Sequence, residues 1–294
     1  MSLPNAITCD LEDYYQVENA AALVPRDRWD RMPSRLAGST ERVLALLEEA
    51  GVRATFFVLG WNAEREGELV RRVAAAGHEI ASHGYAHRMI AEQSPAQFRD
   101  DVRRAKALLE DLSGRAVWGY RAPTFSVTER TRWALEVLGE EGYRYDSSVF
   151  PIRHDRYGLP SAPRFLHRVG DGAGLVEFPP TTVRLLGCNL PVAGGGYLRL
   201  LPVRLVVAAL RRVHRGGHAA MVYFHPWEVD PEQPRLGLRG LRRFRHYVNL
   251  GRTAEKLRHI LRRLPFTTAR AVVEAWLAAG REPAPDDPQE AEEA

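Results

Sequence analysis

Two histidines in the segment IASHGYAHRM, His83 and His87, have the residue type and spacing of a pair of metal ligands. Imidazole is the commonest metal ligand in proteins, and four residues is about one helical turn, which would place both rings on one face. Gly84 lies between them, however, and costs about 1 kcal/mol in a helix interior relative to alanine. The preceding residues GHEIASH alternate like a short strand, so we expect the pair in a loop at a strand end. On spacing alone, two ordinary polar neighbours are the alternative to a metal site.

The elements that must position these residues alternate between strand and helix at intervals of about 30 residues. Apolar, partly β-branched runs predict strands, and apolar residues at helical spacing that stop at glycine predict helices. Strands are expected at 5–11, 54–60, 78–83, 117–123, 174–183, 219–226 and 265–268, and helices at 34–51, 62–77, 94–114, 128–142, 202–217, 252–264 and 269–280. This alternation is typical of βαβ units and predicts an α/β fold with a parallel sheet, closed or nearly closed into a barrel.

Polar residues follow several of these strands at the end where a βα barrel gathers its functional loops. They are carboxylates after the first strand, the histidine pair after the third, an arginine after the fourth and a histidine after the late strand: Asp10, Glu12, Asp13, His83, His87, Arg121 and His225. Their expected convergence on one rim favours a metal site over chance neighbours.

Length and composition are those of an ordinary globular protein, with 294 residues, 45% hydrophobic and 27% charged. No apolar run approaches the roughly 20 residues of a membrane span. The N-terminus lacks the pattern of a secretory signal, so a cytoplasmic location is expected. Two cysteines, Cys9 and Cys188, are too few for a disulfide framework, and we expect both thiols to be free.

Charge is unevenly distributed along the C-terminal part of the chain. Residues 235–263 contain ten Lys or Arg and a single acid. Such a segment could attract a polyanion or a membrane surface, although a solvated helical face is the ordinary interpretation. Residues 281–294 are acidic and proline-rich, and we expect them to form a disordered tail.

Five short motifs, in order along the chain, resemble those of the polysaccharide deacetylases with the NodB homology domain, carbohydrate esterase family 4. They are TCDLED (8–13), SHGYAH (82–87), GYRAP (119–123), YDSSVFP (145–151) and MVYFHPWE (221–228). The resemblance covers residues 5 to about 280 and implies a distorted (β/α)7 barrel. It further implies a single catalytic domain over residues 1–280, including a subgroup-specific extension from about residue 226.

A narrower resemblance rests on the stretches DLEDYYQV, HPWEVDPEQPR and FRHYVNLGRT. These are similar to the deacetylase subgroup found with exosortase (PEP-CTERM) and exopolysaccharide gene clusters. This resemblance implies a role in modifying a secreted polysaccharide or its precursor.

The family resemblance implies a divalent metal, Zn²⁺ first with Co²⁺ or Ni²⁺ as alternatives, held by two histidines and one carboxylate. Many family members have two adjacent aspartates, whereas this chain has Asp10-Leu11-Glu12-Asp13. Alternation along the strand favours Glu12 as the carboxylate ligand. A turn after the strand favours Asp13, which also matches the family by residue type, and we prefer Asp13.

The resemblance also implies that Asp10 takes a proton from water, that Arg121 orients Asp10 and that His225 protonates the leaving nitrogen. General acid help of this kind is worth roughly 10²–10⁴-fold. The aromatic residues Trp227, Tyr197 and Trp61 could stack on a sugar ring, although such residues are more often core. The implied site is catalytic Asp10, Arg121 and His225, metal ligands Asp13, His83 and His87, and substrate contacts Pro123, Asp146 and Trp227.

We therefore predict a metal-dependent hydrolase that removes N-acetyl groups from N-acetylhexosamine units of a polysaccharide or its lipid-linked precursor. One alternative is a metal-independent amidohydrolase of the same superfamily, similar to allantoinase. Another is a non-catalytic protein that binds an anionic glycan through residues 235–263. A base and an acid together disfavour pure binding, and we expect a carbohydrate partner and no nucleic acid.

Overall fold

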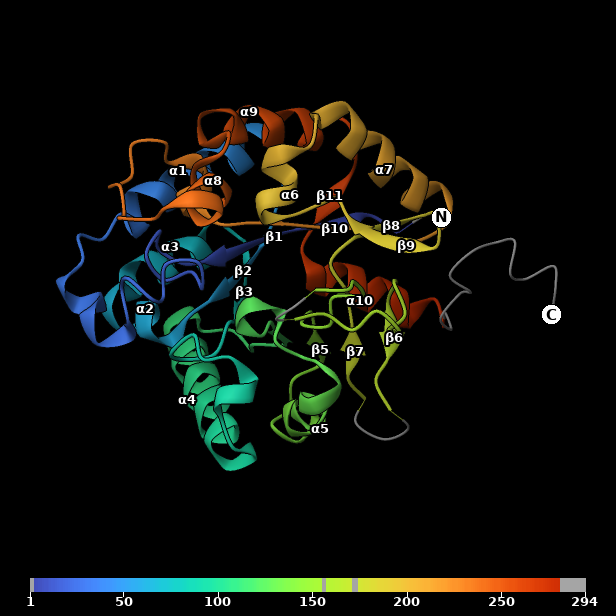
Figure 1. The fold of residues 1–294 in the computed structure, drawn as a ribbon. Coiled ribbons are helices and arrows are strands. Elements are labelled where there is room, and N and C mark those ends of the chain that lie inside the picture. The colour runs from blue at the N-terminus through green and yellow to red at the C-terminus, as the bar shows by residue number, and fades with distance from the viewer. Residues whose placement is uncertain (1–2, 155–156, 171–173, 281–294) are drawn as a thin grey trace.

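A computed structural model describes residues 3–154, 157–170 and 174–280, in which nine strands form one curled sheet covered by helices (Figure 1). The strand order is β10-β1-β2-β3-β4-β5-β7-β6, and β11 also pairs with β1. Every pair in this sheet is parallel except β6 with β7, and β8 and β9 form a separate antiparallel hairpin. The predicted α/β fold of the barrel type is confirmed.

The strands are β1 (Asn5–Leu11), β2 (Thr55–Val58), β3 (Glu79–Ser82), β4 (Gly119–Tyr120), β5 (Tyr145–Asp146), β6 (His167–Arg168), β7 (Val176–Glu177), β8 (Thr182–Leu185), β9 (Cys188–Pro191), β10 (Met221–Phe224) and β11 (Phe266–Thr267). The helices are α1 (Leu36–Ala50), α2 (Gly60–Arg65), α3 (Gly67–Ala75), α4 (Pro95–Ser113), α5 (Trp133–Glu140), α6 (Gly195–Leu200), α7 (Val203–Arg215), α8 (Gly240–Tyr247), α9 (Leu250–Leu261) and α10 (Ala269–Ala278).

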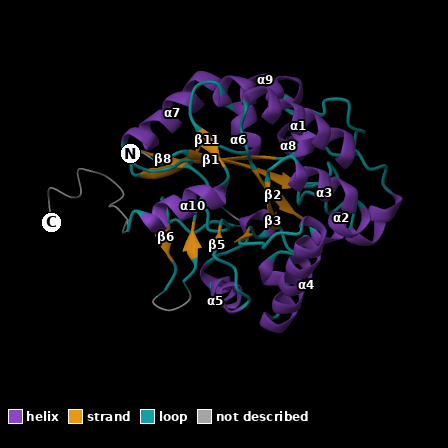
Figure 2. Ribbon diagram, turned by 180° about the vertical axis from the view of Figure 1, so that it is seen from behind, coloured by secondary structure: helices purple, strands orange, loops and turns teal. Residues whose placement is uncertain are grey.

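Alternation along β1 divides its side chains between two layers. Ile7, Cys9 and Leu11 join the large apolar cluster beneath the outer helices. Ala6 instead packs in an inner cluster with residues of β2, β10 and α10, and α10 lies beside the inner strands in both views (Figures 1 and 2). Positions that share the phase of Ala6 therefore face the interior of the curl, which is where polar residues of β1 can meet those of other strands.

Most predicted elements are present, and the differences lie where glycine or local geometry interrupts a pattern. The helix expected at 62–77 is two helices, α2 and α3, because Glu66 leaves helical geometry at φ −118° and ψ 42°. The capping box at Ser94 is formed as expected, with the Gln97 backbone and side chain both bonded to it. The short helices α6 and α8 and the β8–β9 hairpin are not in the sequence-based prediction.

The three stretches behind the narrower resemblance meet in space beside the strand ends. Tyr14 and Tyr15 pack with Trp29, Trp227 and Leu250 in one aromatic cluster. β10 and β11 from the C-terminal part also flank β1 in the main sheet. The shared sheet supports a single domain with a C-terminal extension, which stays a prediction, and the expected tail at 281–294 lies outside the described residues.

Two expectations about membranes and thiols can be compared with the structure. No helix in the described part of the chain combines the length and apolar character needed to cross a membrane. Both cysteines are free thiols, as expected, with Cys9 buried and Cys188 exposed.

Gly119 in β4 is a position where this fold requires the absence of a side chain. A Cβ there would lie 2.1 Å from Cζ of Tyr145, whose buried ring is held by a 2.8 Å hydrogen bond from its hydroxyl to Glu79. We expect Gly119→Ala to lower the free energy of unfolding by about 1–3 kcal/mol, because overpacking displaces this ring. Urea denaturation measures the change.

Gly38→Ala is the matched control for this substitution. Gly38 lies exposed inside α1, and a Cβ there would meet nothing within 4 Å. Alanine should therefore stabilise the protein by roughly 0.5–1 kcal/mol. Equal effects of the two substitutions would contradict the packing around Tyr145.

Candidate active site

Glu12, His83 and His87 form a buried cluster just past the ends of β1 and β3. Oε1 of Glu12 lies 2.7 Å from Nε2 of His83 and 3.1 Å from Nε2 of His87. The three ligand atoms lie within 4.8 Å of one another, which is the arrangement of a possible metal site. Burial would raise the pKa of Glu12, but His87 and His83 together hold it well below its ordinary value.

The hydrogen bonds of His83 show which ring nitrogen faces the cluster. Nδ1 lies 2.7 Å from the backbone carbonyl oxygen of Arg121, which only accepts hydrogen bonds, so Nδ1 carries the proton. Nε2 of His83 therefore faces Glu12, as Nε2 of His87 also does. Two imidazole nitrogens and one carboxylate oxygen are a donor set that fits a metal such as Zn²⁺.

The loop that carries the two histidines is held by its neighbours on both sides. Gly84 has φ 71°, and a Cβ there would come within 2.9 Å of the Asp101 carboxylate. That carboxylate, from α4, accepts a 2.7 Å hydrogen bond from the backbone of Tyr85. Gly60 at the start of α2 donates its N–H to the Gly84 carbonyl at 2.9 Å. These contacts fix the turn that brings His87 back toward His83.

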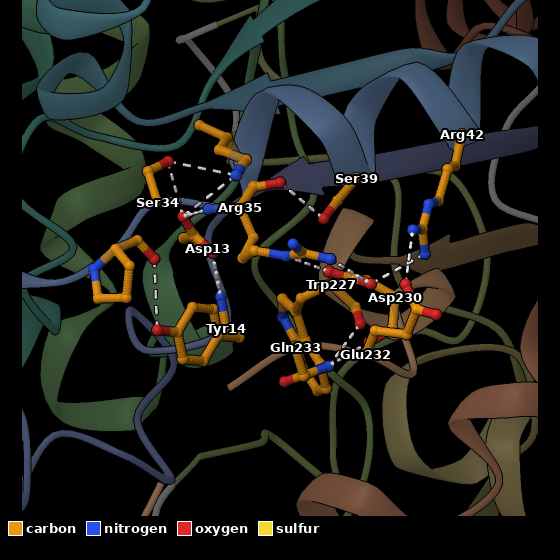
Figure 3. A network of polar contacts seen from close by, with 12 residues as sticks. Asp13, Tyr14, Ser34, Arg35, Ser39, Arg42, Trp227, Asp230, Glu232 and Gln233 are labelled. Atoms are coloured by element: carbon orange, nitrogen blue, oxygen red, sulfur yellow. Dashed lines mark hydrogen bonds and ion pairs between the residues drawn. The ribbon is translucent and has the colours of Figure 1, made fainter. Parts of the chain in front are cut away.

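The structure places Asp13 away from the histidines, which contradicts the preference for Asp13 as the carboxylate ligand. Glu12, the residue that alternation along β1 favours, lies beside the histidines instead. Oδ2 of Asp13 accepts hydrogen bonds from Ser34 Oγ at 2.9 Å and from the backbone N–H groups of Arg35 and Leu36 at 2.8 and 3.2 Å (Figure 3). Asp13 thus caps the start of α1, where unpaired N–H groups and the helix dipole favour an anion.

Asp10 and Arg121 form a buried ion pair on the inner face of the sheet. Arg121 Nη1 donates to Asp10 Oδ1 at 2.5 Å and to Thr8 Oγ1 at 3.0 Å, and Nη2 donates to Ser147 Oγ at 2.9 Å. The guanidinium is fully buried and lies over the ring of Phe57 at 4.0 Å. The second oxygen of Asp10 lies 3.9 Å from Nε2 of His225, so the predicted base and acid stand together.

Glu228 is a site residue that the sequence analysis missed. Its Oε2 accepts the His225 backbone N–H at 3.0 Å and lies 3.3 Å from His225 Nδ1, while Oε1 accepts from Arg199 Nε at 2.7 Å. The sequence contained a pattern that indicates the contact between Glu228 and His225, because a Glu three residues after the N-cap residue of a short helix is typical of a capping box.

Electrostatics around Glu228 favour the charged form of His225. Burial would raise the pKa of Glu228, but Arg199 and His225 lower it to about 2. Burial would likewise lower the pKa of His225, yet Glu228, with Glu12 and Asp10, raises it to about 9. His225 is therefore protonated at neutral pH, as a general acid must be.

The predicted substrate contacts divide into one that lies on the cleft and two that do not. Trp227 lines a cleft of about 450 Å³, and its buried Nε1 has no hydrogen-bond partner among the described residues. Pro123 is buried beside the wall, which Ala122 and Thr124 form instead. Asp146 is buried and bonds Ser148 Oγ at 2.5 Å, so it holds a turn and does not contact His225.

The same cleft contains the catalytic candidates Asp10 and His225 and the three residues of the possible metal site. Its walls include Asp10, Glu12, His83, His87, His225, Glu228 and the aromatic residues Phe125, Tyr197, Tyr223 and Trp227. Thr124 and Phe125 on one wall have φ values of 58° and 50°, the kind of backbone strain that gathers at functional sites. Trp61 packs against Trp29 at 5.3 Å and does not line the cleft.

Two family models match this chain in adjacent segments. Residues 28–143 match the model described as polysaccharide deacetylase, and residues 147–274 match a domain of unknown function, DUF3473. The first of these matches shows that residues 28–143, which are less than half of the chain, are similar to the polysaccharide deacetylase domain.

Among curated relatives, the chain is 35% identical over 98 residues to a peptidoglycan-N-acetylglucosamine deacetylase of Bacillus cereus, covering 33% of this chain and 36% of the relative. It is 30% identical over 137 residues to a peptidoglycan deacetylase of Helicobacter pylori, covering 47% of this chain and 43% of the relative. The chain therefore spans less than half the length of these curated relatives.

Two solved structures share the fold over nearly the whole chain. One, from Mycobacterium smegmatis and assigned to the polysaccharide deacetylases, has a TM-score of 0.60 at 22% identity, covering 97% of this chain and 95% of that one. The other, Puue allantoinase, has a TM-score of 0.59 at 16% identity, covering 93% and 89%. At these identities both similarities establish the fold alone.

The roles of Glu12 and Asp13 can be separated by measuring metal content and stability together. Glu12→Ala should abolish stoichiometric zinc binding, as should His83→Ala, because each removes a ligand atom from the cluster. Asp13→Ala should keep the zinc but lower the free energy of unfolding by about 1–3 kcal/mol, because it leaves buried N–H groups at the start of α1 unpaired.

Elemental analysis of the dialysed protein measures the zinc content, and urea denaturation measures the free energy of unfolding. An Asp13→Ala protein without zinc, beside a Glu12→Ala protein that retains it, would return the ligand role to Asp13.

The proton affinity of His225 should depend on Glu228. A raised pKa means that His225 keeps its proton up to about pH 9 and loses it as the pH rises further. In Glu228→Gln the stabilising carboxylate is gone, so the titration midpoint of the His225 ring should move to lower pH. An NMR titration of the ring protons measures it, with Asp146→Asn as the control that leaves it unchanged. An unshifted midpoint in Glu228→Gln would contradict this pairing.

Proposed function

We propose that this protein is a metal-dependent N-deacetylase that hydrolyses the acetamide of N-acetylhexosamine units in a glycan. The observation that carries the proposal is the convergence of three groups on one cleft. These are the Glu12, His83 and His87 cluster, the buried Asp10 beside Arg121, and the protonated His225 beside Glu228. Amide hydrolysis requires an activated water, a polarised carbonyl and a proton for the departing nitrogen, and this cleft has a group for each.

The residues of the chain divide the reaction between the two sides of the cleft. When bound by Glu12, His83 and His87, a divalent cation polarises the acetyl carbonyl and makes water more acidic. Asp10 accepts the proton of the attacking water, since Arg121 occupies only its other oxygen. His225 then donates a proton to the amine nitrogen that leaves, and Glu228 stabilises the ring in its charged form.

The substrate class is proposed from the cleft walls and from the names of the relatives. The curated relatives are named for peptidoglycan and, in Bradyrhizobium sp., for chitooligosaccharide, both of which contain N-acetylhexosamine. The aromatic walls formed by Tyr197, Tyr223 and Trp227 suit the apolar faces of pyranose rings. Trp227 Nε1–H is a free buried donor for a polar group of a sugar.

The biological role that we propose is the modification of an exopolysaccharide or of its lipid-linked precursor, with a cytoplasmic location. The exopolysaccharide role rests on the stretches DLEDYYQV, HPWEVDPEQPR and FRHYVNLGRT. Their packing into one aromatic cluster beside the cleft supports a common purpose for them. The metal is proposed to be Zn²⁺, with Co²⁺ or Ni²⁺ as alternatives.

Acetate release from a panel of N-acetylated oligosaccharides tests the proposal. Activity should be lost with a chelator and restored by Zn²⁺ or Co²⁺, and His83→Ala should abolish it. Asp10→Asn should lower kcat by roughly 10²–10⁴-fold while the protein still binds zinc, because it removes the base and keeps the cluster.

Two results would contradict the proposal. Hydrolysis of allantoin by the chelated protein would favour the metal-independent amidohydrolase. Glycan binding that Asp10→Asn leaves unchanged, with no acetate released from any sugar, would favour the non-catalytic binding protein.

A further inference from the structure

Helix α8 exposes apolar side chains to solvent on a surface that is otherwise positively charged. Leu241 is 60% exposed and Phe244 is 52% exposed, and their spacing of three residues places them on one face of the helix. In the helix itself, His246 is the buried residue. The arginines around them are also exposed: Arg239, Arg242, Arg243 and Arg245.

These four arginines carry charge that no carboxylate among residues 3–154, 157–170 and 174–280 neutralises. None of them forms an ion pair with a carboxylate in the described part of the chain, whereas Arg258 of α9 and Arg262, just after α9, pair with Glu49. No acidic residue occurs between Glu232 and Glu255. We call the set of Arg239, Leu241, Arg242, Arg243, Phe244 and Arg245 the α8 surface.

The last turn of α8 attaches the helix firmly to the floor of the cleft. Arg199 donates to the backbone carbonyls of Arg245 at 2.9 Å and His246 at 2.8 Å, and the His246 ring stacks on Trp227 with centroids 4.6 Å apart. At the other end, Asn19 Nδ2 donates to the Arg242 carbonyl at 2.8 Å. The α8 surface therefore has a defined position relative to the catalytic residues.

The α8 surface lies at the edge of the cleft. Arg245 and His246 line the cleft, together with Leu200 of α6, which is itself 43% exposed. A partner bound to the α8 surface would thus stand beside the opening through which substrate reaches His225.

We propose that the α8 surface docks this protein on an anionic phospholipid membrane, with the cleft opening beside the bilayer. Arginines attract the anionic headgroups, and Leu241 and Phe244 enter the boundary between headgroups and acyl chains, as in interfacial amphipathic helices. A nucleic acid would satisfy the arginines but leave the aliphatic Leu241 in water, so the combination of charge and apolar side chains favours a lipid surface. This inference does not depend on the reaction that the cleft catalyses.

Co-sedimentation of the full chain with vesicles of phosphatidylglycerol and phosphatidylcholine tests this docking. The wild type should bind vesicles that contain phosphatidylglycerol, less tightly as salt is added, and should bind pure phosphatidylcholine far more weakly. The double variants Leu241→Ser/Phe244→Ser and Arg242→Gln/Arg243→Gln should each lower the partition coefficient by about tenfold or more. Because these side chains are exposed, circular dichroism and the thermal midpoint should stay unchanged.

Matched controls come from α7, which also exposes leucine and arginine. Leu205 is 59% exposed there, and Arg211 and Arg212 are exposed as well. Leu205→Ser and Arg211→Gln/Arg212→Gln should bind vesicles as the wild type does.

Three outcomes would overturn the proposal. The first is a wild type that does not bind phosphatidylglycerol vesicles at low salt. The second is an equal loss of binding in the α7 controls. The third is a combination of two results: Leu241→Ser/Phe244→Ser binds vesicles as the wild type does, and Arg242→Gln/Arg243→Gln loses binding both to vesicles and to RNA. That combination would make the α8 surface a general polyanion site.

Discussion

The site depends on the close approach of Nε2 of His83 to Oε1 of Glu12, which lie 2.7 Å apart, with Nε2 of His87 3.1 Å from the same oxygen. Arg121 orients the His83 ring, because its backbone carbonyl accepts a hydrogen bond from Nδ1 and so turns Nε2 toward Glu12. The guanidinium of the same residue pairs with Asp10. The cation site and the base are therefore positioned by one buried residue at the end of β4, and a shift of that strand would disturb both.

His225 lies between two carboxylates that are each neutralised by a buried arginine. Asp10 is paired with Arg121 on one side, and Glu228 is paired with Arg199 on the other. Buried charges are tolerated when they are paired and hydrogen-bonded, and here the pairs also stabilise the imidazolium. Arg199 extends the arrangement further, since it binds the carbonyls at the end of α8 and so links the acid to the exposed α8 surface.

Much of the fold could be predicted because its local patterns agree with its tertiary packing. Continuous apolar runs such as TFFV mark strands buried on both faces, and glycines such as Gly51 and Gly114 end helices in the left-handed conformation. Short elements without a strong period could not be found in this way. α8 begins with six successive exposed residues, so it buries too little for its pattern to indicate a core-facing helix.

The sequence by itself determined which residues reach the cleft from the strand ends, since parallel strands place Asp10, His83 and His225 on one rim. It also contained the alternation that turns Glu12 inward. Only the tertiary structure decided which group each of the other carboxylates contacts. Asp13 accepts hydrogen bonds from backbone N–H groups at the start of α1, Glu228 contacts His225, and Asp146 accepts a hydrogen bond from Ser148 in a turn. The reason is that a strand position depends on local backbone geometry, whereas a carboxylate's partner depends on which donors distant segments bring near it.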